Sequence, residues 1–258
     1  MKRIKTIRAG RLVFSVCYSQ ALPGEPAKAR AAKNKCSTLA RRALNFRAAW
    51  QKLRLLLAAN FGHGDLWITL TYDDAHLPDR RADAKKQVTA FLDRLRAARR
   101  QTGEELRYLY NTEELLDGGG RRLHHHLVIN AGAERRDYEL IRSLWRCGDN
   151  IEIRRLGEHD LFGDDFLELA QYMCKERDPD AKVYNVGDKC WVSSRNLARP
   201  QTESETVGDN VTVTAPPGAR IIDQDHKLNE YGSFDYIVYL LPANAPEPRH
   251  RPKPRRRN

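Results

Sequence analysis

The sequence predicts an α+β fold in which helices pack on one face of a central antiparallel sheet. Segments with apolar residues at helical spacing alternate with short runs rich in β-branched and aromatic residues. These segments do not follow the regular β-α repeat that is typical of a parallel sheet. A glycine-rich turn at residues 117–120 separates two strand-like runs, which predicts an antiparallel hairpin.

Each element has its own signal in the sequence. The first helix has an apolar stripe and is followed by Gly62 and Gly64, which end it. The run Leu66–Tyr72 alternates β-branched and aromatic residues and precedes two aspartates, as a strand before a turn does. In chain order we expect a helix over Lys33–Asn60, a strand over Leu66–Tyr72, a helix over Ala84–Arg100, strands over Leu106–Glu113 and Leu123–Asn130, a helix over Tyr138–Arg146, a strand over Asn150–Arg154 and a helix over Asp165–Arg177.

The texture of the sequence predicts three parts. Residues 1–200 are expected to form one domain with a basic N-terminal helical region. Residues 201–245 are expected to form a loop and a C-terminal extension packed on that domain, because Pro200–Gly218 resembles a linker and Ala219–Leu241 contains one strand-like run. Residues 246–258 hold six Lys or Arg among four prolines, so we expect a disordered basic tail.

Composition excludes several classes of protein. The chain is 41% hydrophobic and 31% charged, and no apolar run approaches the roughly 20 residues that a membrane span needs. The N-terminus lacks the apolar stretch of a secretory signal. The five cysteines are odd in number and widely spread, so we expect reduced thiols. These observations together predict a soluble cytoplasmic protein.

Positive charge is concentrated at the start of the chain. Residues 1–60 hold 14 Lys or Arg and one acid, whereas the whole chain has a net charge of +11. Such a local field attracts polyanions, most commonly the phosphates of nucleic acids. A solvated basic face or a contact with an acidic protein is the alternative. The candidate DNA contacts on the first helix are Arg41, Arg42, Arg47, Lys52 and Arg54.

Three residues of the predicted hairpin are candidate metal ligands. Alternate side chains of a strand share a face, so His124 and His126 lie about 7 Å apart at their Cα atoms while His125 points the other way. Glu113, on the partner strand, adds a carboxylate; Glu114 faces the opposite side unless a bulge shifts the register. Two imidazoles and one carboxylate leave positions open for phosphate oxygens, which suits Mg²⁺ or Mn²⁺. Three adjacent histidines can also be simply exposed or part of the core.

Tyr172 is a candidate nucleophile on the last helix. Apolar residues fall at i, i+3, i+4, i+7 and i+8 from Phe166, and Tyr172 and Lys175 lie outside that stripe. Lys175 is one turn away, near enough to stabilise a phenolate or to neutralise a phosphate. A phenol with a pKa near 10 is a poor nucleophile at neutral pH and needs such help. The alternative is an amphipathic helix with an exposed tyrosine and lysine.

In this ordered set of motifs the chain resembles the rolling-circle replication initiators of the HUH endonuclease superfamily, in the branch of replication-associated proteins of phages and plasmids. The stretches that carry the resemblance are Ile68–Tyr72, Glu113 with the His124–His126 strand, Tyr172–Lys175 and Trp191–Pro200. The chain departs from the family in having His125 where a bulky hydrophobe is usual, and in its longer glycine-rich turn before the histidines.

The resemblance implies a ferredoxin-like (palm, or RRM-like) fold whose antiparallel sheet presents a divalent metal, with Glu113, His124 and His126 as ligands. Tyr172 would attack single-stranded or hairpin origin DNA, forming a 5′-phosphotyrosine bond and freeing a 3′-hydroxyl for a host polymerase. Lys175 would position the phosphate or assist proton movement, and Arg195 would contact DNA. A host helicase is expected, because the chain has no Gly-Lys-Ser/Thr phosphate-binding loop. The expected location is the cytoplasm of a bacterial host cell.

Three other functions stay open. A non-catalytic DNA- or RNA-binding module would use the same basic surface without needing the tyrosine. A hydrolytic nuclease would share the metal site but use water as its nucleophile. A plasmid relaxase or single-tyrosine transposase would use the same chemistry as an initiator.

Overall fold

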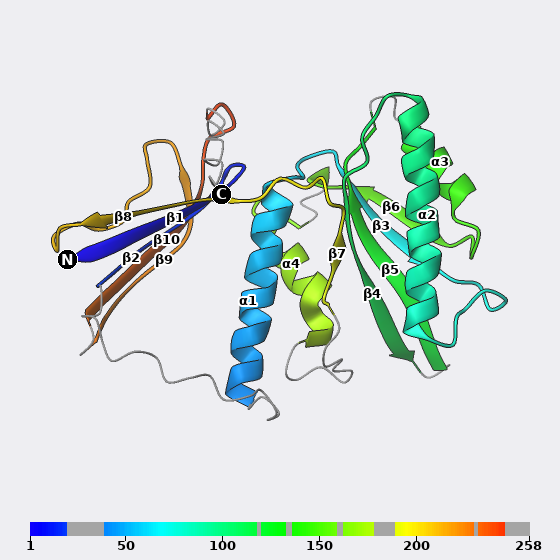
Figure 1. The fold of residues 1–258 in the computed structure, drawn as a ribbon, viewed down its shortest axis with the longest axis horizontal. Coiled ribbons are helices and arrows are strands. Elements are labelled where there is room, and N and C mark those ends of the chain that lie inside the picture. Colours follow the sequence, from blue (N-terminus) through cyan, green and yellow to red (C-terminus); the bar gives the residue numbers. More distant parts are fainter. Residues whose placement is uncertain are drawn as a thin grey trace, which may run out of the picture. The chain divides into compact units, whose positions relative to one another are not determined.

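The computed structural model describes residues 1–19, 39–117, 120–132, 136–158, 162–177, 189–229 and 232–245. The chain divides into two compact units. The larger unit is Ala27–Arg199, and the smaller unit combines Met1–Pro26 with Pro200–Asn258. Each contains one five-stranded antiparallel sheet, and the described residues hold four α-helices, which confirms the α+β class and is compatible with a ferredoxin-like fold (Figure 1).

The larger unit contains a sheet with strand order β6-β3-β5-β4-β7. Its elements are α1 (Leu39–Ala58), β3 (Leu66–Thr71), α2 (Arg81–Gln101), β4 (Tyr108–Asp117), β5 (Gly120–Ile129), α3 (Asp137–Leu144), β6 (Ile151–Arg155), α4 (Leu167–Cys174), the short 3₁₀ helix η2 (Lys175–Arg177) and β7 (Val192–Ser193). Each predicted helix and strand of this unit is present, with ends shifted by a few residues. The part of the first predicted helix before Leu39 and residues 118–119 of the predicted turn lie outside the described residues.

Helices cover both faces of this sheet, so the expectation of helices on one face was wrong. Alternate residues of β3 explain why. Leu66, Ile68 and Leu70 are buried with α2 and α3 in one core, whereas Trp67 is buried with α1 and α4 in a second core (Figure 1). Because both faces of the central strands are apolar, each needs its own helical layer.

The smaller unit contains a sheet with strand order β8-β1-β2-β10-β9. Its strands are β1 (Lys2–Ala9), β2 (Leu12–Ser19), β8 (Gln201–Val207), β9 (Arg220–Asn229) and β10 (Gly232–Leu240). The sequence analysis placed residues 1–200 in one domain, but β1 pairs with β8 and β2 pairs with β10, so the N-terminal hairpin groups with the C-terminal part of the chain. The expected linker Pro200–Gly218 contains β8, and the expected single strand of Ala219–Leu241 is the hairpin of β9 and β10.

Two further expectations concern the tail and the cysteines. The predicted disordered tail, residues 246–258, lies outside the described residues. Cys17, Cys147, Cys174 and Cys190 are free thiols, as expected, and Cys36 lies outside the described residues. In the part of the chain that the structure describes, no helix combines the length and apolar character that crossing a bilayer requires.

Candidate functional site

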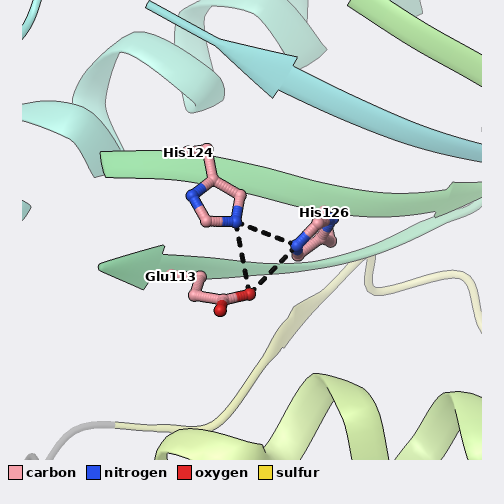
Figure 2. Close-up of side chains that lie close together, drawn as sticks. All are labelled: Glu113, His124 and His126. Carbon is pink, nitrogen blue, oxygen red and sulfur yellow. Dashed lines mark hydrogen bonds and ion pairs between the residues drawn. The ribbon is translucent and has the colours of Figure 1, made fainter. Parts of the chain in front are cut away.

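The β4-β5 hairpin brings the three candidate metal ligands together. Glu113 pairs directly with His124 across the hairpin, and His126 follows two residues later on the same face (Figure 2). The Oε2 atom of Glu113 lies 3.2 Å from His124 Nε2 and 3.0 Å from His126 Nε2, and the two Nε2 atoms are 3.0 Å apart. All three side chains are buried. The period of two in the strands thus assembles the predicted cluster.

The size of this triangle fits a divalent cation. An octahedral shell with bonds of about 2.1 Å has edges of about 3.0 Å, because an octahedron edge is about 1.4 times the bond length. The three ligand atoms are separated by 3.0–3.2 Å, which is the size of one face of such a shell. The opposite face would stay open to phosphate oxygens or water. The residues present therefore fit a Mg²⁺ or Mn²⁺ ion, and the donor set does not choose between them.

Neighbouring side chains orient His126 for this role. Thr69 lies opposite His126 on β3, and its Oγ1 is 3.1 Å from His126 Nδ1. If Nδ1–H donates to this oxygen, the lone pair of Nε2 faces the ligand cluster. The ring of Trp67 stacks on His126 at 4.9 Å. Burial lowers the pKa of His126, although Glu113 opposes the shift, so the imidazole is held in the neutral form that a metal ligand requires.

Lys175 reaches the cluster from η2. Its Nζ lies 2.5 Å from Oε1 of Glu113, the carboxylate oxygen that is not in the triangle. Burial raises the pKa of Glu113, but hydrogen bonds from His124, His126 and Lys175 outweigh it and the net shift is downward. Burial lowers the pKa of Lys175, but its contact with Glu113 outweighs this effect and the net shift is upward. The site therefore contains an ionised carboxylate and a cationic lysine at neutral pH.

Tyr172 lies beside this cluster on α4. The helix buries Leu169, Ala170, Met173 and Cys174, the stripe expected from its sequence, and leaves Tyr172 half-buried on its border. The hydroxyl of Tyr172 is 3.0 Å from His126 Nε2, and Lys175 Nζ is 3.9 Å from the centre of the tyrosine ring. The arrangement places a phenol, a cation and a metal-binding triad within contact of one another.

The middle histidine belongs to the other face of the sheet. His125 is fully buried, with Nδ1 3.0 Å from Thr112 Oγ1 and Nε2 2.6 Å from the hydroxyl of Tyr72. Burial, with the nearby His124 and His126, lowers the pKa of His125 to about 3, so it is neutral. Two hydroxyl partners explain how a polar ring is accommodated where an apolar residue would otherwise pack.

The predicted DNA contacts have different environments. On α1, Arg41, Arg47 and Lys52 are exposed and Arg42 is half-buried, so these four are accessible to a polyanion. Arg54 is buried instead. Its Nε donates to the carbonyl of Asp165 at 2.9 Å and its Nη2 to the Asp165 carboxylate at 2.7 Å.

This burial argues against the predicted DNA contact of Arg54. Asp165 Oδ1 accepts the Leu167 N–H at the start of α4, so Arg54 instead fixes the N-terminal end of that helix. Arg195 is exposed and lines a cavity of about 770 Å³ together with Arg96 and Arg100.

Sequence reasoning did not find Trp67 and Thr69, which lie beside His126. The signal was present in Ile68–Tyr72, because every second residue of that strand must face the histidines. Reasoning from sequence also missed Arg81 and Glu176, which contact each other and β4. No local pattern marks this pair, since its members are 95 positions apart.

Comparison with protein families adds an independent observation. Residues 65–177 match the model of a family of replication-associated proteins, the ORF2 type. The matched segment covers less than half of the chain and includes Glu113, both metal-facing histidines, Tyr172 and Lys175. No curated protein and no solved structure matches the chain. The family match supports a relationship to replication initiators and a role in replication.

Proposed function

We propose that this protein initiates rolling-circle replication by nicking and rejoining single-stranded DNA at an origin, through a covalent 5′-phosphotyrosine intermediate at Tyr172. The observation that carries the proposal is the 3.0 Å approach of the Tyr172 hydroxyl to His126 Nε2, an atom of the buried cluster that fits a divalent cation. A nucleophile and a phosphate-activating ion would then act on the same phosphodiester. The family match over residues 65–177 supports the biological setting.

Each residue has a distinct task in this reaction. Glu113 Oε2 and the Nε2 atoms of His124 and His126 would hold the ion. A bound Mg²⁺ or Mn²⁺ would act as a Lewis acid toward the scissile phosphate. Lys175 holds Glu113 through its other oxygen and lies over the Tyr172 ring, where its charge favours the phenolate.

The transfer itself is a transesterification. The Tyr172 phenol gives up its proton and its oxygen forms a bond to phosphorus. The bond from phosphorus to the 3′ oxygen of the preceding nucleotide breaks, and that oxygen takes up a proton to become the 3′-hydroxyl from which a host polymerase extends. Rejoining is the reverse reaction. Only one tyrosine lies at the described site, so a second transfer would use a second subunit or a reset site.

The partners follow from the same proposal. Single-stranded or hairpin origin DNA would lie across the site, and the exposed basic residues of α1 together with Arg195 would contact its phosphates. A host helicase would supply unwinding. A relaxase or a single-tyrosine transposase would use this chemistry too, and the identity of the DNA that is cleaved would distinguish these roles.

Adduct formation tests the proposal directly. Purified protein would be incubated with a labelled pool of single-stranded DNA that covers the cognate origin, with Mn²⁺ or with EDTA, and separated on a denaturing protein gel. We expect a metal-dependent adduct that is absent in Tyr172→Phe and retained in Tyr138→Phe, a matched change on α3. Metal-dependent cleavage that survives Tyr172→Phe would instead identify a hydrolytic nuclease. Binding without an adduct or cleavage would identify a binding module.

A further inference from the structure

The edge of β4 beside Glu113 is completed by two side chains rather than by a strand. On this side β4 pairs with β7 only at Leu109 and Tyr110. Further along the same edge, the Thr112 carbonyl and the Glu114 N–H face outward, because backbone groups of alternate residues point to the same side of a strand. Arg81 donates to the Thr112 carbonyl, and Glu176 Oε1 accepts the Glu114 N–H at 2.7 Å.

Arg81 and Glu176 also bind each other. Arg81 Nη1 lies 3.2 Å from Glu176 Oε1, and Nη2 donates to Oε2, so guanidinium and carboxylate meet through two parallel contacts. Both side chains are largely buried, at 15% and 16% exposure. A two-contact pair of this kind fixes relative orientation as well as distance. We call this pair and its two backbone contacts the Arg81–Glu176 bridge.

The bridge joins three elements at the candidate site. Arg81 is the first residue of α2, and Glu176 lies in η2, which continues α4. The two β4 groups that it binds belong to the residues on either side of Glu113. Glu176 itself directly follows Lys175, whose ammonium contacts Glu113.

We infer that the Arg81–Glu176 bridge is a positioning device for the nucleophile: it fixes the end of the Tyr172 helix against the strand that carries Glu113. The inference rests on the proposed function. Neither residue contacts the metal-binding atoms, so the bridge acts through the placement of Tyr172 and Lys175. A displacement of about 1 Å between reacting groups can cost about 100-fold in rate. Loss of the bridge therefore lowers the rate of transfer and leaves the ligand cluster intact.

The test compares Arg81→Met and Glu176→Ala with Arg80→Met. Arg80 is the neighbouring arginine, and it forms an exposed ion pair with Asp83 instead of the bridge. We expect kcat for adduct formation to fall about 10- to 100-fold in the two bridge variants, with KM for DNA and Mn²⁺ affinity changed less than about threefold. Arg81→Lys, which keeps a cationic donor, recovers part of the rate. Arg80→Met behaves as wild type.

A second readout needs no DNA and no activity. The Glu114 amide hydrogen, which the bridge protects, exchanges with solvent faster in Arg81→Met and Glu176→Ala but not in Arg80→Met. Faster exchange with an unchanged kcat would overturn the inference, because the bridge would then be structural only. Unchanged exchange would overturn it too, and so would a fall in kcat that is matched by lost Mn²⁺ affinity.

The same readouts separate this inference from the proposed function. If wild-type protein forms no adduct, the proposed function fails and the positioning role fails with it, whereas amide exchange still reports whether the bridge joins strand and helix. If Arg81→Met does not fold, Arg81→Lys and Glu176→Gln carry the comparison. Each removes one part of the bridge while keeping a polar side chain of similar length.

Discussion

Replacing Lys175 by methionine should strengthen metal binding while it slows the proposed transfer. The ammonium of Lys175 contacts Oε1 of Glu113, and a bound ion would contact Oε2 of the same carboxylate. The lysine therefore competes electrostatically with any cation at the cluster. Methionine keeps most of the length of the side chain and removes the charge, so the full carboxylate charge becomes available to the ion.

The magnitude can be worked from the geometry. Nζ lies 2.5 Å from Oε1, which places a dication on the other oxygen about 5 Å from the ammonium. Because the Lys175 side chain is 40% exposed, we use an effective dielectric constant of about 40–80, which gives a repulsion of about 2–3 kcal/mol. Salt screening lowers this value further. We therefore expect Mn²⁺ to bind roughly tenfold more tightly, since about 1.4 kcal/mol corresponds to a factor of ten.

The assay is a Mn²⁺ titration at neutral pH, followed by electron paramagnetic resonance of the free ion. Lys86→Met is the matched control, because Lys86 forms an exposed ion pair with Asp83 at 2.9 Å on α2. Its affinity should equal that of the wild type. Equal or weaker Mn²⁺ binding by Lys175→Met would refute the electrostatic reasoning, and would mean that Lys175 supports the site by holding Glu113 in place.

Three further predictions test the surroundings of the site. Thr69→Val removes the partner of His126 Nδ1 and should weaken Mn²⁺ binding about tenfold in the same titration, whereas unchanged binding would show that the ring needs no such support. His125→Leu removes buried hydrogen bonds and should lower the free energy of unfolding in urea by about 1–3 kcal/mol without weakening Mn²⁺ binding; lost Mn²⁺ binding would contradict the assignment of His125 to the opposite face. Arg54→Met leaves Asp165 without its buried partner and should destabilise the protein by about 3 kcal/mol, with no change in the salt dependence of DNA binding; a shallower salt dependence would restore Arg54 as a DNA contact.

The site was predictable from sequence where it depends on local periodicity. The alternation of β5 places His124 and His126 on one face and His125 on the other, and the short connection of the hairpin sets Glu113 opposite His124. The apolar stripe of α4 places Tyr172 at the border of the buried surface. These relations follow from the repeat of a strand or a helix, so they require no knowledge of distant contacts.

The smaller unit was not predictable in the same way. β8 contains only one apolar residue, Val207, and β1 is rich in charged residues, so neither shows the pattern of a half-buried strand. Their pairing joins Ile4 to Glu205 across some 200 residues of sequence. Strand formation depends strongly on such neighbours, which is why β propensity alone is a weak guide. The fate of Arg54 has the same cause, since its partner Asp165 is 111 positions away.

The placement of the proposed nucleophile is therefore a property of the whole larger unit. With eight residues, α4 is too short to be stable alone, so packing must hold it. Its buried stripe fixes its face, Arg54 of α1 binds its start through Asp165, and Arg81 of α2 binds its end through Glu176. These arginines do not contact the metal-binding atoms, yet they determine where Tyr172 and Lys175 lie. A chain could therefore retain every residue of the motifs and still transfer DNA slowly if either arginine pair were lost.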